Sequence, residues 1–320
     1  MYQERTLFES LRSGPASCGS SGIDYVDVRT VPLEDFKNQY VLNGGRPAML
    51  QGVIEDGDWP AAHKWSSVEA FLRHYGEIPL KVMEKRPEHG MGRPFLVRIP
   101  FLLYKEYSEH QNADDPFYAF EPDLIENRTV FLSDYKQPRY FQQDLYNLDE
   151  QTREFYPNYK HLIIGCERTG TNLHVDPKCT GAWNTLLVGH KKWAMFPPGT
   201  DERYLEELGT KAYSKTPATY WWQDIAPKLR KDIGMVEVVQ KPGETIFVPS
   251  GWWHCVLNLD FTIAITENFL VPETLGDVWV DLSTGWPKFA EYLEEKYPHL
   301  VGSLPKEQPK HKIITSALTY

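Results

Sequence analysis

The residues with the clearest chemical potential are two histidines and an aspartate. His174 and Asp176 lie two positions apart in the stretch NLHVDP, residues 172–177. On a β-strand, side chains two positions apart point to the same face, roughly 6.5 to 7 Å from each other, so this imidazole and carboxylate can converge on one cation. His254 follows the Pro-Ser-Gly turn signal at 249–251 and precedes a run of strand-forming residues. Two histidines and one carboxylate form the facial triad that leaves positions open on Fe(II), and zinc accepts the same ligands.

Two other chemistries have to be weighed against a metal site. An H-x-D pair arises by chance in many proteins, and Ser250 lies near His254 as a serine nucleophile near its base would. No G-x-S-x-G elbow surrounds Ser250, which disfavours a serine hydrolase. Cys255 follows His254 directly, but a cysteine here is typical of a small buried hydrophobe. The 4 cysteines form no C-x-x-C pair, so they predict neither a zinc finger nor a disulfide framework and suit a reduced compartment.

Short apolar segments around these residues predict the architecture that positions them. Beyond His161, β-forming runs alternate with Gly and Pro turn signals, with little helical pattern between them. This arrangement is typical of a sandwich, jelly roll or barrel. We predict a mainly β fold with flanking helices, in which residues 151–271 form the catalytic core and residues 201–231 an insertion of helix or irregular structure. The predicted strands are 161–166, 172–176, 183–188, 193–196, 236–239, 245–249, 255–257 and 262–269.

The segments that flank this core differ from it in pattern. Residues 1–23 are small and polar in their second half, which predicts a loosely held arm. Residues 24–150 mix helix and strand signals and are expected to wrap the core. Residues 272–320 predict two helices with a break at Pro287, followed by a fraying lysine-rich tail. The elements expected in the N-terminal part are helices that open at Pro32 and Ser66, helices at 100–107 and 141–148, and a strand at 47–52.

The charge balance restricts the classes of partner. The chain has 320 residues, 34 of them basic and 44 acidic, for a formal net charge of −10. A protein with a broad electrostatic grip on DNA or RNA is usually basic, so nucleic acid is not an expected partner unless a local basic groove exists. No run approaches the roughly 18 apolar residues of a membrane span, and residues 1–22 lack the apolar segment of a secretory signal. We expect a soluble intracellular protein of the nucleus or cytoplasm, without a membrane partner.

Two long motifs in the C-terminal half carry a resemblance to a known family. They are RTGTNLHVDPKCTGAWNTLLVGHKKWAMFPP, residues 168–198, and KPGETIFVPSGWWHCVLNLDFTIAITENF, residues 241–269. The chain resembles the JmjC-domain Fe(II)- and 2-oxoglutarate-dependent oxygenases over about residues 32–271, in particular the branch known as arginine demethylase and lysyl hydroxylase, once called the phosphatidylserine receptor. The resemblance implies a double-stranded β-helix, the cupin-like jelly roll of two four-stranded sheets, with the metal inside one mouth. Three upstream segments share the likeness: 45–65, 113–120 and 134–146.

The resemblance also implies roles for individual residues. His174, Asp176 and His254 match the Fe(II) ligands of a site that uses 2-oxoglutarate as cosubstrate together with O2. Lys191 matches the lysine that binds the distal carboxylate of 2-oxoglutarate, and Thr171 matches a threonine that hydrogen-bonds the same carboxylate. A dianion in an apolar barrel needs such donors, because an unpaired buried carboxylate is costly. Thr171 lies three positions before His174, so only a turn or bulge would bring both to one face.

Three further positions match the cosubstrate pocket of that branch. Asn184 and Thr266 match polar residues that line the pocket, and Tyr118 matches a tyrosine that reaches it, although its spacing alone predicts a core position. His161 stands where the branch usually carries an aromatic residue, and we expect it to pack or to support the pocket rather than to bind metal. The tryptophan pair at 221–222 is expected to line the core or a groove rather than to form a cage for a methylated cation.

These matches imply a dioxygenase that hydroxylates a protein side chain, with lysine as the first expectation. Demethylation of N-methyl-arginine or N-methyl-lysine is a variant of the same reaction. An RNA or small-molecule oxygenase on the same fold remains an alternative, as does a metal-binding scaffold without turnover, although a scaffold would not need the cosubstrate anchor Lys191. The acidic balance suits a basic peptide substrate. The helices after Pro272 are a candidate surface for a homodimer.

Overall fold

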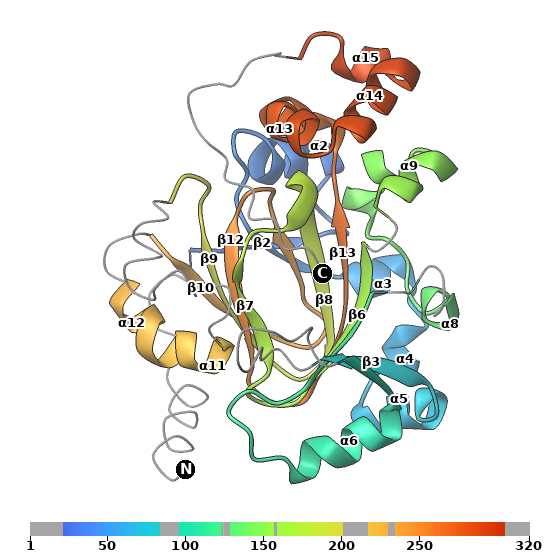
Figure 1. Cartoon of the computed structure of the whole chain (residues 1–320), viewed down its shortest axis with the longest axis vertical. Coiled ribbons are helices and arrows are strands. Elements are labelled where there is room, and N and C mark those ends of the chain that lie inside the picture. The colour runs from blue at the N-terminus through green and yellow to red at the C-terminus, as the bar shows by residue number, and fades with distance from the viewer. Residues whose placement is uncertain are drawn as a thin grey trace.

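Two curved sheets lie face to face, with helices on their outer sides (Figure 1). Residues 1–21 of the predicted N-terminal arm, the tail after residue 304 and residues 201–216 and 230–231 of the predicted insertion lie outside the residues that the structure describes. This structure is a computed structural model, and it describes residues 22–83, 96–122, 124, 129–156, 159–200, 217–229 and 234–304.

Eight strands of the predicted core form the barrel. The larger sheet contains the order β11-β8-β13-β6, and the smaller sheet has the order β10-β9-β12-β7. Neighbouring strands within these two sets are all antiparallel. The predicted double-stranded β-helix is therefore confirmed. The strands are β6 (Lys160–Gly165), β7 (Gly170–His174), β8 (Gly181–Val188), β9 (Lys191–Phe196), β10 (Val236–Gln240), β11 (Thr245–Val248), β12 (Trp253–Asn258) and β13 (Thr262–Phe269).

The N-terminal region contributes strands to the larger sheet in addition to wrapping it. The strand β2 pairs with β11 at one edge of the core set, and β5 pairs with β6 at the other edge. The domain boundary expected at residue 150 stays a prediction, but one hydrogen-bonded sheet crosses it. The N-terminal strands are β1 (Asp24–Asp27), β2 (Ala48–Gln51), β3 (Pro79–Met83), β4 (Leu96–Pro100) and β5 (Tyr118–Glu121).

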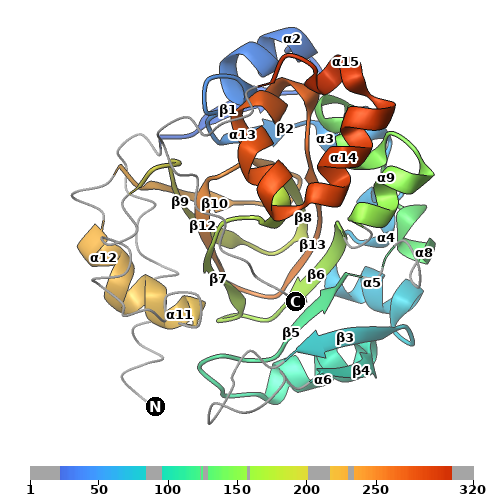
Figure 2. The same ribbon diagram turned by 45° about the horizontal axis from the view of Figure 1, so that its top comes forward.

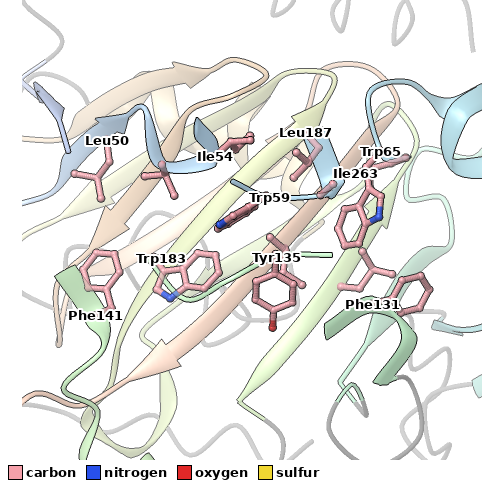
Figure 3. Packing of buried hydrophobic residues seen from close by; sticks show 14 of the residues in the cluster. Leu50, Ile54, Trp59, Trp65, Phe131, Tyr135, Phe141, Trp183, Leu187 and Ile263 are labelled. Atoms are coloured by element: carbon pink, nitrogen blue, oxygen red, sulfur yellow. The ribbon is translucent and has the colours of Figure 1, made fainter. Parts of the chain in front are cut away.

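Alternation along β8 sends its side chains into two environments. Trp183 and Leu187 project to the outer face of the larger sheet, where they join a buried cluster with Trp59 and Tyr135 (Figure 3). Asn184 lies between them on the strand and therefore faces the barrel interior. The aromatic side chains of the N-terminal region thus cover the outer face of the strands that carry the site. The helices on this side are α3 (Val53–Gly57), α4 (Ala61–Lys64), α5 (Val68–Tyr75) and α6 (Phe101–His110).

Most of the predicted N-terminal helices are present. The helix that opens at Pro32 is α2 (Leu33–Phe36), which continues as the π-helical turn η1 (Lys37–Val41). Ser67 caps α5, because its hydroxyl oxygen accepts a hydrogen bond from the backbone N–H of Ala70.

The single helix predicted over 141–148 is wrong. The segment contains only two short 3₁₀ turns, η2 (Arg139–Phe141) and η3 (Leu145–Asn147). Asp144 separates them in an extended conformation, with φ −96° and ψ 121°. Its carboxylate oxygen Oδ1 accepts hydrogen bonds from the backbone N–H of Tyr146 and of Leu270 in a distant part of the chain. This tertiary contact outweighs the local helical pattern.

A second helical layer covers the outer face of the smaller sheet. Its elements are α11 (Ala218–Tyr220), η6 (Trp221–Ile225) and α12 (Ala226–Leu229). Trp221 and Trp222 are completely buried there, in a cluster with side chains of β7, β9 and β12. The expectation that this pair lines the core is confirmed.

The C-terminal helices lie at one end of the barrel, where α13 contacts η4 (Figure 2). The predicted break at Pro287 is confirmed, because Trp286 leaves the helical conformation before the proline that opens α14. Within the described residues, none of the helices has the length and apolar character needed to cross a bilayer. The remaining helices are α8 (Thr129–Leu132), α9 (Glu150–Phe155), η4 (Pro177–Cys179), α13 (Pro272–Gly285), α14 (Pro287–Lys296) and α15 (Pro298–Val301).

Candidate metal centre and cosubstrate pocket

His174, Asp176 and His254 converge inside the barrel. One ligand atom from each lies within 4.8 Å of the other two. The Oδ1 atom of Asp176 lies 3.7 Å from Nε2 of His174 and 3.8 Å from Nε2 of His254. Both histidine side chains are buried. The two ring nitrogens and the carboxylate oxygen therefore point toward one small volume, as the ligands of a single cation would.

The two histidines meet because their strands pair in register, whereas Asp176 reaches the cluster from an extended segment beyond the end of β7. His174 is the last residue of β7 and pairs with His254 of β12. The prediction that Asp176 lies within the same strand is wrong, because β7 ends at His174 and Asp176 precedes η4. Its backbone stays extended, with φ −60° and ψ 141°. Pro177 then opens the turn, so the alternation that places Asp176 beside His174 persists for two residues beyond the ladder.

Backbone carbonyl groups orient both imidazole rings. Nδ1 of His174 donates to the carbonyl oxygen of Asn172 at 2.7 Å, and Nδ1 of His254 donates to that of Trp252 at 3.1 Å. In each case the acceptor lies two residues before the histidine. These hydrogen bonds place the ring proton on Nδ1 and leave the Nε2 lone pair directed at the shared volume, as in metal-bound histidines.

The charge states of the cluster also fit a metal ion. Burial alone would raise the pKa of Asp176, but the neighbouring His254 and His174, together with the Asn268 side chain, hold it below its ordinary value. Burial, reinforced by the adjacent His174, lowers the pKa of His254 to about 4. At neutral pH the cluster therefore contains an ionised carboxylate and a neutral His254 imidazole, the forms that coordinate metals.

An irregularity in the pairing of β7 with β12 brings Thr171 to the metal-facing side. His174 pairs with His254, whereas Thr171 pairs with Val256, and the register shifts between the two pairs. Three residues of β7 thus match two residues of β12, which is a β-bulge. His254 and Val256 share one face of β12, so their partners His174 and Thr171 share it as well. The bulge expected from the spacing of Thr171 and His174 is present.

The other predicted pocket residues also face the interior. Asn184 and Thr266 are cross-strand partners on β8 and β13, and His161 of β6 pairs with Thr266 on its other side. The Thr266 hydroxyl donates to the Trp183 carbonyl oxygen at 2.6 Å. Oδ1 of Asn184 is buried and accepts no hydrogen bond from any described residue. A buried acceptor in a barrel interior of this kind is suited to a polar ligand.

Lys191 and Tyr118 lie deeper in the same interior. Lys191 pairs with Asn258 on β12, four positions beyond His254 and on the same face. Only 1% of Lys191 is exposed, and its Nζ donates to Oδ1 of Asn258 at 2.9 Å. The Tyr118 ring lies so close to Gly165 of β6 that a Cβ atom on this glycine would be 2.8 Å from it. The structure therefore brings every predicted site residue into one interior, lined by both sheets.

Of the histidines outside the triad, His161 takes the packing position expected of it, whereas the side chain of His190 is half-exposed. The His161 ring packs against Phe120 at an interplanar angle of 34°, with ring centroids 4.8 Å apart, and His161 lies in the row that includes Thr266. His190 lies at a turn and pairs through Nδ1 with Asp260 at 2.7 Å.

The residues around Lys191 could not be recognised from the sequence, because their contact with Lys191 depends on which strands become neighbours. They are Asn258, Thr169 and Gly165.

Comparison with known proteins places this site in a family. The family model of the JmjC domain, hydroxylase, matches residues 161–269. The bifunctional arginine demethylase and lysyl-hydroxylase psr-1 of Caenorhabditis elegans is 32% identical over 291 residues, which are 87% of this chain and 70% of that protein. This chain belongs to the JmjC family. The triad and the jelly roll described above are thus those of a JmjC protein.

Two further JmjC relatives differ in the share of their length that matches. The lysine-specific demethylase JMJ21 of Arabidopsis thaliana is 36% identical over 264 residues, or 81% of this chain, but the match spans only 26% of that longer protein. The 2-oxoglutarate and iron-dependent oxygenase JMJD4 of Danio rerio is 26% identical over 290 residues, 87% of this chain and 67% of that protein.

Proposed function

We propose that this chain is an Fe(II)- and 2-oxoglutarate-dependent dioxygenase that hydroxylates a protein side chain, with lysine as the first candidate. The observation that carries the proposal is the convergence of His174, Asp176 and His254 in the same buried interior as Lys191. The JmjC family and the names of its relatives support it, since these name iron, 2-oxoglutarate, lysine and arginine. A metal-binding scaffold would have no use for a buried cation on the same interior face as the triad.

In this proposal the triad holds Fe(II), and the donor set fits that metal. Fe(II) with 2-oxoglutarate and O2 supplies an oxidative decarboxylation that yields succinate and CO2 and oxidises a C–H bond of the substrate. The Lys191 ammonium binds the distal carboxylate of 2-oxoglutarate, and Thr171, aimed by the bulge, donates its hydroxyl to the same group. Asn184 and Thr266 line the pocket beside them.

The residues around the site also limit side reactions. The aromatic cluster on the outer face of the larger sheet and the buried tryptophan pair on the smaller sheet close the barrel wall. These layers keep water from reaching the interior through the barrel wall, which favours oxidation of a bound substrate over unproductive turnover.

The substrate is a protein, and a basic peptide suits the net charge of −10. Hydroxylation requires only a C–H bond at the oxidising centre, whereas demethylation requires a methylated nitrogen with its methyl group placed there. We therefore favour hydroxylation of lysine over demethylation of N-methyl-arginine or N-methyl-lysine. The nuclear or cytoplasmic location and a homodimer through the helices after Pro272 remain predictions.

The experiment that tests the function is succinate release by the purified protein with Fe(II), 2-oxoglutarate and lysine- or arginine-containing peptides. Mass spectrometry of the peptides distinguishes a gain of one oxygen atom from the loss of one methylene. Lys191→Ala should abolish turnover at low 2-oxoglutarate while leaving metal content unchanged. Lys192→Ala is the matched control, because Lys192 lies on the outer face of the same strand, paired with Glu237 at 3.0 Å. Equal 2-oxoglutarate affinity in both variants would refute the role of Lys191.

A further inference from the structure

A buried chain of hydrogen bonds runs from Lys191 to residues that were not predicted as part of the site. Lys191 and Thr169 are each 1% exposed and Asn258 is 0% exposed. Nζ of Lys191 donates to Oδ1 of Asn258 at 2.9 Å, and Nδ2 of Asn258 donates to Oγ1 of Thr169 at 2.8 Å. The Thr169 hydroxyl donates in turn to the Cys166 carbonyl oxygen at 2.5 Å.

The direction of every bond in this chain is determined by chemistry. An ammonium group can only donate, so the Asn258 oxygen must face Lys191. The Asn258 amide nitrogen then faces Thr169, and the Thr169 hydroxyl must direct its proton to the Cys166 carbonyl group. The arrangement therefore has one self-consistent orientation, and it holds the acceptor of Asn258 at a fixed point beside the ammonium.

Backbone hydrogen bonds also hold Asn258 against the turn that carries Thr169. The N–H of Asn258 donates to the Thr169 carbonyl oxygen at 2.8 Å, and the N–H of Arg168 donates to the Asn258 carbonyl oxygen at 3.0 Å. Arg168 adopts a left-handed conformation, with φ 70°, which is uncommon outside glycine. The turn between β6 and β7 is thus bent to close on Asn258.

Gly165 leaves the space that this chain of hydrogen bonds occupies. A Cβ atom at this position would lie 2.3 Å from both Asn258 Nδ2 and Thr169 Oγ1, and 2.8 Å from the Tyr118 ring. Any side chain here would displace the amide from Lys191. The glycine is therefore part of the same construction.

We propose that Asn258, held by Thr169 over Gly165, is the positioning residue for Lys191 and directs its ammonium group toward the distal carboxylate of 2-oxoglutarate. Asn258 is itself uncharged, so it orients the ammonium without competing for it as a carboxylate would. This inference rests on the proposed function, because it requires that Lys191 binds the cosubstrate. It goes beyond that function because it identifies the residues that orient Lys191. It also explains why the hydrogen-bond partner of Lys191 is the amide of Asn258.

The decisive variant is Asn258→Asp, which preserves shape but adds a carboxylate beside Lys191. The probe is 2-oxoglutarate titrated calorimetrically into the full chain loaded with Mn(II), with the melting temperature of the protein measured without 2-oxoglutarate. We expect the Kd for 2-oxoglutarate to rise about tenfold or more, because the new carboxylate occupies the ammonium. The carboxylate cannot donate to Thr169 as the amide Nδ2 does, so the melting temperature should fall, and the titration is run well below it. If Asn258 has only a structural role, the folded variant should bind 2-oxoglutarate with the wild-type Kd despite its lower melting temperature, and that result would overturn the proposal.

A second variant keeps the proposal testable if Asn258→Asp does not fold. Thr169→Val removes the hydroxyl that holds the amide, and we expect it to weaken 2-oxoglutarate binding about fivefold, as loss of one hydrogen bond would. Its matched control is Thr185→Val, because Thr185 is equally buried but bonds to Thr245 at 2.6 Å on the outer face of the larger sheet. The control should bind 2-oxoglutarate as the wild type does.

A double variant separates failure of this inference from failure of the proposed function. If Lys191→Ala leaves 2-oxoglutarate affinity unchanged, the cosubstrate role of Lys191 fails. If Lys191→Ala weakens binding, Thr169→Val should add nothing further in that background, because it acts through the lysine. Additive effects, or wild-type affinity in both Asn258→Asp and Thr169→Val, would overturn the positioning role alone.

Discussion

The buried carboxyl group of Asp144 should make the stability of this fold depend on pH. Burial is the main cause that raises the pKa of Asp144 from 3.8 to about 7, although backbone N–H groups of Leu270 and Tyr146 oppose it. The second oxygen, Oδ2, is buried and has no hydrogen-bond partner among the described residues. Asp144→Asn retains the Oδ1 acceptor and removes the charge.

The sign and size of the effect follow from where the proton binds. Between about pH 4 and pH 7 the folded protein holds the proton on Asp144, whereas the unfolded chain has released it. The folded state thus binds more protons, so the contribution of Asp144 to stability falls as the pH rises through this window and is constant above it. Each pH unit over which Asp144 stays fully protonated corresponds to about 1.4 kcal/mol, and the group is half titrated at pH 7, so from pH 5 to pH 7 the wild type should lose about 2 kcal/mol relative to Asp144→Asn.

Urea unfolding of the metal-free protein, followed by tryptophan fluorescence at pH 5, 6, 7 and 8, measures this difference. The unpaired amide of the variant adds a constant offset, so the diagnostic quantity is the change of the difference with pH. Titrating groups that do not interact with Asp144 cancel between the two proteins. Parallel stability curves over this range would refute the reasoning that Asp144 is protonated in the folded state at pH 5 and 6.

Three further perturbations have defined outcomes. His174→Ala should lower the iron content of the purified protein, measured by metal analysis, and abolish succinate release, because two ligands remain. Gly170→Ala places a Cβ atom 2.0 Å from the Val256 carbonyl oxygen, so it should disrupt the bulge, cost about 2 kcal/mol or more in urea unfolding and weaken metal binding. Gly285→Ala, where an added Cβ would meet no described atom within 4 Å beyond its chain neighbours and its own helix backbone, is its control and should lower neither stability nor metal binding. Asp134 is fully buried and accepts hydrogen bonds from Lys64, Trp65 and Tyr75, so Asp134→Ala should destabilise the fold by about 3 to 5 kcal/mol without changing 2-oxoglutarate affinity in the folded protein.

Local chemistry made the metal centre predictable. The donor atoms of His174, Asp176 and His254 are properties of residue type, and strand alternation correctly placed the first two side by side. The strand pattern of the core was equally readable, since short apolar runs between turn signals form strands in many contexts. The resemblance to the JmjC family then pointed to Lys191 and Thr171, which spacing alone did not identify.

Errors arose where long-range contacts override local pattern. The helical signal over 141–148 yields to the hydrogen bond between Asp144 and Leu270, more than a hundred residues away. The strand expected to include Asp176 ends earlier, because the ladder with β12 stops at the His174–His254 pair. Neither event has a signal within a short window of sequence.

By itself, the sequence determined which groups can do chemistry, where strands alternate and which side chains are apolar, because these are properties of each residue and its near neighbours. Tertiary structure alone decided how those groups meet. The bulge that turns Thr171 toward the triad exists only because β7 pairs with β12. The alignment of Lys191 by Asn258 and Thr169 likewise requires that β9 and β7 flank β12. The strand register and the identity of neighbouring strands are set by the packing of whole sheets. That packing places the Lys191 ammonium on the same interior face as the metal centre.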